Sequence, residues 1–171
     1  YEDEPSTEPI PFLKKVKELY FTDNCNIERI SSQAFLGQNY PELKEIKSNE
    51  TNNSFNKDMK IIEQYAFKGT QIKELILNGI QLNIGVFENC AELRTLIFAQ
   101  NEKRDPLVIG IDAFKNCKDI GIETRYTVKI PRLLEIKGGA FIGCKNLKTL
   151  YFSDCIDCFE FMGTYYVVLK K

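Results

Sequence analysis

The sequence predicts an α/β solenoid in which similar coils stack into one elongated body. One pattern recurs along the chain: an aliphatic residue, an Ala-Phe pair or a variant of it, usually a Cys three residues after the Phe, and then a short alternating strand. The phenylalanines of successive copies are separated by 32, 20, 27 and 27 residues, a range of periods typical of solenoids, whose repeats cannot bury their apolar face alone. A chain of 171 residues with 43% apolar content is also long enough for one domain with a sizeable core.

The recurring phenylalanines are expected to stack into an aromatic spine on one side of the core. An aliphatic residue precedes each of them by five positions, and another follows before the next strand. Truncating one of these rings to alanine is expected to cost about 3–5 kcal/mol in the free energy of unfolding, as for other buried aromatic side chains. The phenylalanines are Phe35, Phe67, Phe87, Phe114 and Phe141, the preceding aliphatic residues are Ile30, Ile62, Leu82, Ile109 and Ile136, and the following ones are Leu43, Ile72, Leu93, Ile120 and Leu147.

Segments of alternating character between these turns predict the strands of one parallel sheet. They are expected within residues 12–21, 43–47, 72–77, 94–98, 127–130 and 148–152, the fifth ending at Pro131 because proline cannot donate to a ladder. Alternation assigns one set of side chains to the core and the other to solvent. The core set is Leu19, Phe21, Ile46, Leu75, Leu77, Leu96, Phe98, Leu150 and Phe152. The solvent set, taken here as the candidate binding face, is Glu18, Tyr20, Glu45, Lys47, Glu74, Ile76, Thr95, Ile97, Lys129, Thr149 and Tyr151.

Three regions are expected along the chain. Residues 1–11 are acidic, proline-rich and without a core-facing pattern, which predicts a linker. Residues 12–152 are expected to form the solenoid, of about five to six coils, and residues 153–171 a C-terminal cap with a β-hairpin around Gly163. Within the solenoid, residues 48–60, 99–106 and 121–126 interrupt the repeat and are interpreted as inserted loops.

Composition excludes several classes of function. The net charge is −1 with acids and bases interspersed, so no overall field steers the chain onto nucleic acid or an acidic membrane. No apolar run approaches the roughly 18 residues of a membrane span, and the first residues lack the layout of a signal peptide. The absence of histidine removes the commonest general base and every His-containing metal site. We therefore expect no enzyme, cofactor or metal site; a carboxylate-based hydrolase is the remaining catalytic alternative, but the repeat register places no pair of acids on one site.

The run VKIPRLLEIKGGAFIGCKNLKTLYF at residues 128–152 resembles the BspA-like class of leucine-rich repeat, in which an I-x-I-P strand, an Ile-Gly pair, Ala-Phe, Cys and Leu follow one another. VIGIDAFKNCKDI at residues 108–120 matches the second half of that pattern, including Ile109 and Gly110. The resemblance covers about residues 16–152, apart from the insertions, the missing Cys of the first two repeats and the scarcity of Ile-Pro pairs. It implies a right-handed leucine-rich-repeat solenoid with a parallel sheet on the concave side and short helical turns and loops on the convex side. It also implies a surface or secreted protein of host-associated microbes that acts by adhesion or protein binding.

The cysteines form two sets. Cys90, Cys117 and Cys144 each lie three residues after a repeat phenylalanine and should be neighbours in successive coils, within reach of disulfide geometry. A cysteine at a repeat position is usually a small buried hydrophobe, so the reduced, buried state is expected. Cys155 and Cys158, the sole Cys-x-x-Cys, are expected to form a local disulfide or to pack as two thiols; a zinc site would need two further ligands, and a redox site would need a helix start.

These observations favour a non-catalytic protein-binding or adhesion module of a cell-surface or secreted protein. Recognition is expected through the concave strand face and the insertions at residues 48–60 and 99–106, with Tyr20 and Tyr151 as anchors. The expected partner is a protein or glycan on a host or neighbouring cell; the chain is expected to be a monomer, with any signal or anchor segment outside it. The alternative is a structural spacer that holds another domain away from a surface. Asn49 and Asn52 begin glycosylation sequons, which matter in a secreting eukaryote.

Overall fold

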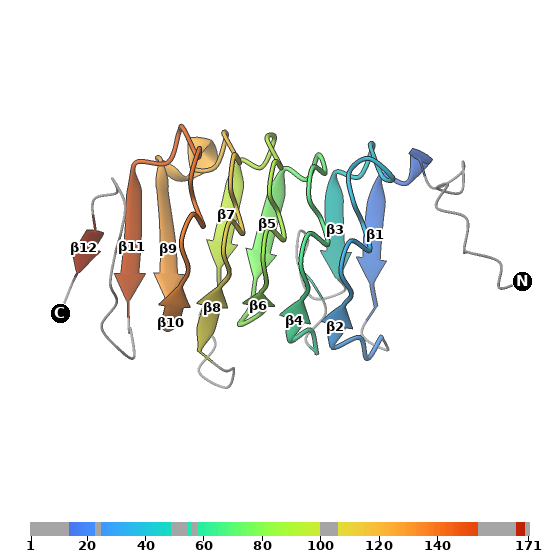
Figure 1. Cartoon of the computed structure of the whole chain (residues 1–171), viewed down its shortest axis with the longest axis horizontal. Helices are drawn as coiled ribbons and strands as arrows, with labels where there is room; N and C mark the ends of the chain where they lie inside the picture. Colours follow the sequence, from blue (N-terminus) through green and yellow to red (C-terminus); the bar gives the residue numbers. More distant parts are fainter. Residues whose placement is uncertain are drawn as a thin grey trace, which may run out of the picture.

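The computed structural model shows a parallel β-solenoid with almost no helix (Figure 1). It describes residues 14–22, 25–48, 55, 58–99, 106–153 and 167–169. Each coil contains a strand of a front sheet, a shorter strand of a back sheet and a turn that carries the repeat phenylalanine. The predicted linker at residues 1–11, the hairpin around Gly163, the Cys155 and Cys158 pair, and both sequons lie outside the described residues.

The front sheet confirms the six predicted strands. It consists of β1 (Glu18–Phe21), β3 (Glu45–Ser48), β5 (Glu74–Leu77), β7 (Thr95–Phe98), β9 (Thr127–Pro131) and β11 (Thr149–Ser153). A further strand, β12 (Val167–Leu169), pairs in parallel with β11. The predicted alternation also holds, because every residue of the core set is buried except Leu19, which is half-buried and packs against the core.

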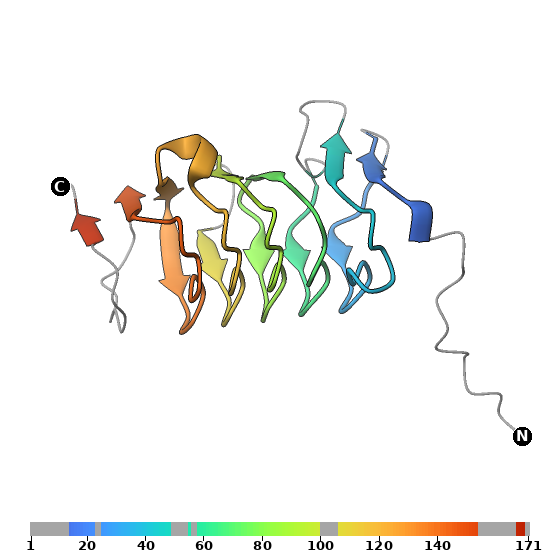
Figure 2. The ribbon, with the colours of Figure 1, turned by 90° about the horizontal axis from the view of Figure 1, so that it is seen from above.

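The back sheet is a feature that the sequence interpretation missed. Its strands are β2 (Arg29–Ile30), β4 (Ile61–Ile62), β6 (Gln81–Leu82), β8 (Leu107–Ile109) and β10 (Leu133–Ile136). They lie side by side and point the same way (Figure 2). Each contains one of the aliphatic residues that precede a phenylalanine by five positions. Four of these strands have only two or three residues, which is too short for alternation to reveal, and the four residues of β10 do not alternate between buried and exposed.

The sequence resemblance predicts short helical turns on the convex side, in the part of each coil that contains the back strand and the phenylalanine turn. The described residues instead show hydrogen-bonded turns and the back sheet, with the short 3-10 helix η2 (Ile122–Thr124) before β9. The helical part of the predicted α/β class is therefore wrong, whereas the parallel solenoid is confirmed. The right-handed sense of the coil and the concavity of the front sheet stay predictions.

The front sheet is interrupted, whereas the back sheet is continuous. The front strands form three separate ladders, β1-β3, β5-β7 and β9-β11-β12. Between the first two, the Gln71 amide donates to the Leu43 carbonyl at 3.0 Å and the Lys73 amide to Lys44 at 3.3 Å, just before the strands begin. Between the second and third, the Gly121 amide donates to the Arg94 carbonyl at 3.0 Å and η2 follows. The back sheet runs without a break in the order β10-β8-β6-β4-β2 and so links all five complete coils.

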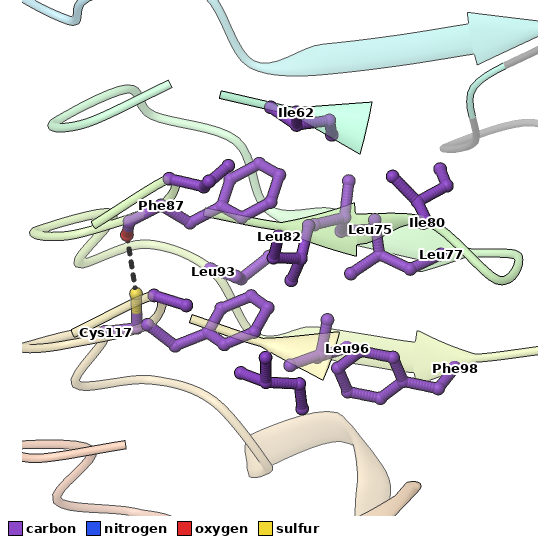
Figure 3. Packing of buried hydrophobic residues seen from close by; sticks show 14 of the residues in the cluster. Ile62, Leu75, Leu77, Ile80, Leu82, Phe87, Leu93, Leu96, Phe98 and Cys117 are labelled. Carbon is purple, nitrogen blue, oxygen red and sulfur yellow. Dashed lines mark hydrogen bonds between the residues drawn. The ribbon is translucent and has the colours of Figure 1, made fainter. Parts of the chain in front are cut away.

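The predicted aromatic spine is confirmed and forms the centre of the core. Ring centroids are 5.2 Å apart from Phe35 to Phe67, 5.4 Å from Phe67 to Phe87, 5.5 Å from Phe87 to Phe114 and 5.3 Å from Phe114 to Phe141, with interplanar angles between 8° and 17°. Phe35, at the N-terminal end, is half-buried, and the other four rings are buried. Aliphatic side chains from both sheets pack beside this stack (Figure 3).

Two side chains of the first insertion lie in the core, although the sequence predicts only an inserted loop there. Phe55 is 4% exposed, and its ring centroid lies 5.5 Å from that of Phe21 and 5.7 Å from that of Phe67. Met59, near the end of the same insertion, is fully buried. The side chains of Phe55 and Met59 therefore belong to the core cluster.

Close approach of the coils explains the glycine of the Ile-Gly pair. A Cβ atom built on Gly110 would lie 2.5 Å from the Asn83 carbonyl oxygen of the preceding coil. The Gly110 amide also donates to the Leu82 carbonyl at 2.8 Å. A larger residue at position 110 would have to push these two backbones apart.

Candidate binding face on the front sheet

The structure places all residues of the predicted solvent set on the outward side of the front strands, in two rows. In the strand register Glu18 lies opposite Glu45, Glu74 opposite Thr95, and Thr127 opposite Thr149. Two residues further along each strand, Tyr20 lies opposite Lys47, Ile76 opposite Ile97, and Lys129 opposite Tyr151. Row A is thus Glu18, Glu45, Glu74, Thr95, Thr127 and Thr149, and row B is Tyr20, Lys47, Ile76, Ile97, Lys129 and Tyr151.

Every member of both rows is exposed or half-buried. Thr127 is the one member of row A that sequence reasoning missed. It is the first residue of β9, and the register with Thr149 shows its place in the row. The signal was available, because Thr127 lies two residues before Lys129 and so shares its side of the strand.

The N-terminal end of the face is held by a three-membered ion cluster. The Lys47 Nζ atom lies 2.8 Å from a Glu45 carboxylate oxygen and 3.1 Å from a Glu18 carboxylate oxygen. The hydrogen bonds that the Lys47 ammonium donates, first to Glu45 and then to Glu18, raise the pKa of Lys47. Lys47 is therefore protonated at neutral pH, and it balances part of the acidic charge of row A.

Apolar and aromatic residues are concentrated in row B. Tyr20 is 59% exposed and Ile97 is 43% exposed, while Ile76 and Tyr151 are half-buried. The two isoleucines are adjacent in the middle of the row, and a tyrosine lies in the first and in the last of its strands. An apolar centre with polar neighbours is the composition of protein-binding surfaces.

The two insertions predicted to extend this face lie mainly outside the described residues. At the described end of the second insertion, the Gln81 side chain of β6 accepts from the Val108 amide at 2.8 Å and donates to the Pro106 carbonyl at 2.6 Å. Its C-terminal end is thus attached to the back sheet.

The repeat cysteines are buried free thiols, as predicted. The Sγ atoms of Cys90, Cys117 and Cys144 donate to the carbonyls of Phe67, Phe87 and Phe114 in the preceding coil, at 3.2, 3.0 and 3.2 Å. Figure 3 shows the bond between Cys117 and Phe87. Burial raises the pKa of Cys117 well above its usual range and that of Cys144 to about 12. Cys117 and Cys144 therefore stay protonated at neutral pH. All three thiols link neighbouring coils.

Within residues 14–153, leaving out the undescribed segments, no group of three or more Cys, Asp or Glu side chains is arranged to hold a metal ion. In the same part, no helix has both the length and the apolar character needed to cross a bilayer.

The stacked coils, the phenylalanine spine and the repeat cysteines define a solenoid repeat protein. Residues 12–148 match the family described as BspA type leucine rich repeat region, in six copies. The chain belongs to this family, whose repeats are commonly protein-binding and typically non-catalytic. Comparison with curated proteins and with solved structures found no match to either.

Proposed function

We propose that the chain is a non-catalytic binding module of a cell-surface or secreted protein, and that row B is its contact surface for a protein partner. The observation that supports this proposal most directly is the alignment of Tyr20, Ile76, Ile97 and Tyr151 in one row. These four side chains face outward, whereas the alternate residues of the same strands are buried in the core. Tyrosine provides a large contact area at a low cost in conformational entropy, so both ends of the row suit recognition.

The remaining charged residues of the face fit this role. In the Glu18, Glu45 and Lys47 cluster one ammonium binds both carboxylates, so the cluster keeps one net negative charge and suits the solvated rim of an interface rather than its buried centre. The isoleucines at the centre would be the part that loses water on binding. Adhesion and a location on the cell surface extend the family assignment and belong to the same proposal.

The test uses the whole chain against a panel of purified extracellular-matrix and cell-surface proteins, measured by surface plasmon resonance. A variant with alanine at Tyr20, Ile76, Ile97 and Tyr151 is expected to weaken the binding of any captured partner at least tenfold, because truncation of such anchors typically costs more than 1 kcal/mol each. The matched control carries alanine at Ile84, Ile111 and Ile142, which are 39%, 44% and 50% exposed and lie in or beside the phenylalanine turns. Equal loss in both variants, or none in the first, would contradict the assignment of row B.

A structural spacer is the second candidate, and the continuous core favours it. The spine and the back sheet join five coils into one body, as a rigid spacer requires. A spacer should bind no member of the panel, and its alanine variant should behave as the parent does.

A further inference from the structure

A column of basic residues runs along the corner where each coil enters the front sheet. The backbone hydrogen bonds show that these residues occupy one repeated position: the Lys44 amide donates to the Lys17 carbonyl at 2.9 Å, the Lys73 amide to Lys44 at 3.3 Å, and the Arg94 amide to Lys73 at 2.8 Å. Two coils further on, the Lys148 amide donates to the Tyr126 carbonyl at 2.9 Å. The basic column is Lys17, Lys44, Lys73, Arg94 and Lys148, with Tyr126 in place of a cation in the fifth coil.

The fifth coil, which has Tyr126 at this position, still has a positive charge near it, because the Lys148 ammonium lies over the Tyr126 ring. The Lys148 Nζ atom lies 4.1 Å from the centroid of the Tyr126 ring. This cation–π contact holds the ammonium above the fifth coil. Lys73, Arg94 and Lys148 are exposed, and Lys44 is half-buried. The backbone positions that carry the column therefore follow one another at roughly the spacing of parallel strands, about 4.8 Å, with this single substitution.

Most of this charge is not neutralised by ion pairs within the described residues. Lys44, Lys73 and Lys148 form none there, and the two pairs that involve the column are long: Lys17 to Glu42 at 3.8 Å and Arg94 to Asp119 at 4.0 Å. In the neighbouring row A, the carboxylates of Glu18 and Glu45 are bound by Lys47. Row A then changes from glutamate to threonine at Thr95, so row A places hydroxyl groups rather than carboxylates next to Arg94 and Lys148.

Like charges stacked at this spacing repel one another, and a ligand that carries negative charge at the same spacing would relieve the repulsion. We propose that the basic column binds a linear acidic polysaccharide that runs across the strands. A sugar ring spans about the width of one strand, so each acidic group can meet a cation of a successive coil. An extended acidic peptide fits less well, since its same-side carboxylates are about 6.6 Å apart. Single-stranded nucleic acid binds on stacking platforms, and the column's one aromatic ring is covered by Lys148.

This site is separate from row B and does not depend on the protein-binding proposal. Its test is isothermal titration of the whole chain with heparin as the probe, at 50 and 200 mM salt. Heparin is expected to bind, with an affinity that falls steeply as salt rises, because binding releases counterions. The variant Lys73→Gln with Lys148→Gln is expected to weaken binding about tenfold and to flatten the salt dependence, since each exposed cation contributes modestly.

The matched control is Lys60→Gln with Lys137→Gln, which removes the same charge next to strands of the back sheet. Its heparin affinity should stay within about twofold of the parent, and both variants should unfold at the parent's urea midpoint. The proposal is overturned if heparin does not bind at 50 mM salt, or if both variants lose affinity equally. Binding of poly-glutamate or a single-stranded oligonucleotide as tightly as heparin would also overturn it. Row B alanine variants should retain heparin binding, which separates this result from the protein-binding test.

Discussion

The replacement Phe87→Ala tests whether the coils share one core. Phe87 is fully buried, and its ring stacks on Phe67 on one side and on Phe114 on the other. Burial of the side chain is worth about 1.5–3 kcal/mol, and each stacked pair adds about 0.5–1.5 kcal/mol. With partial collapse of the cavity, we expect a loss of about 3–5 kcal/mol in the free energy of unfolding.

Two matched variants separate the stacking from simple loss of volume. Phe35 stacks on Phe67 alone among the spine rings, touches Tyr40 edge-on, and is half-buried, so Phe35→Ala should cost roughly half as much as Phe87→Ala. Phe87→Leu keeps most of the volume and should cost less than about 2 kcal/mol. The loss in the free energy of unfolding should be largest for Phe87→Ala and smaller for both Phe35→Ala and Phe87→Leu.

The assay is urea unfolding followed by circular dichroism, supported by thermal melts. Phe87→Ala should lower the melting temperature by about 10 °C, given the size of the chain. Because the spine links successive coils, the loss should appear in the whole transition and not in one end of it. If Phe87→Ala costs no more than Phe35→Ala, the rings do not act as one stack and the reasoning fails.

Three further changes test the contacts between coils. Cys117→Val keeps the approximate volume but removes the thiol that donates to the Phe87 carbonyl at 3.0 Å, so it should be less stable than Cys117→Thr by about 1 kcal/mol in urea unfolding; equal values would mean that the bond is negligible. Burial raises the pKa of the Cys144 thiol to about 12, above its unfolded value of about 8.5, so its stabilising contribution is complete below pH 8.5 and is lost as the pH rises towards 12. Unfolding between pH 8 and pH 11 should show this decline, and a Cys144→Ala variant should show less of it. Gly110→Ala should destabilise by about 1–3 kcal/mol because its Cβ would meet the Asn83 carbonyl, whereas Gly138→Ala, with no atom within 4 Å, should be neutral or slightly stabilising.

Much of the fold could be predicted because the repeat fixes where large apolar side chains go. Phe67, Phe87 and Phe114 recur at one offset from an aliphatic residue, and a parallel stack gives such residues one place in the core. The front strands were equally accessible, since four or five residues are enough for alternation to appear. The back sheet was not, because a strand such as Arg29–Ile30 has no second period to compare.

The burial of Phe55 and the basic column were not predicted, for different reasons. Phe55 lies among asparagines and serines, so its local sequence gives no sign that the ring reaches the core. The basic column was missed because Lys44 and Lys73 fell inside the predicted strands, where alternation places them on the same side as the core residues; in the structure β3 and β5 begin one residue later. Their common position becomes evident when the backbone hydrogen bonds align the coils.

The interruptions of the front sheet indicate where the chain tolerates added length. An inserted segment normally disrupts the pairing of the strands on both sides of it, but β3 and β5 have no ladder to lose. The same holds between β7 and β9, where η2 occupies the gap. Because the back sheet joins the coils on the other side, foreign peptide segments could be grafted after β3 or before β9 without cutting the molecule into independent halves.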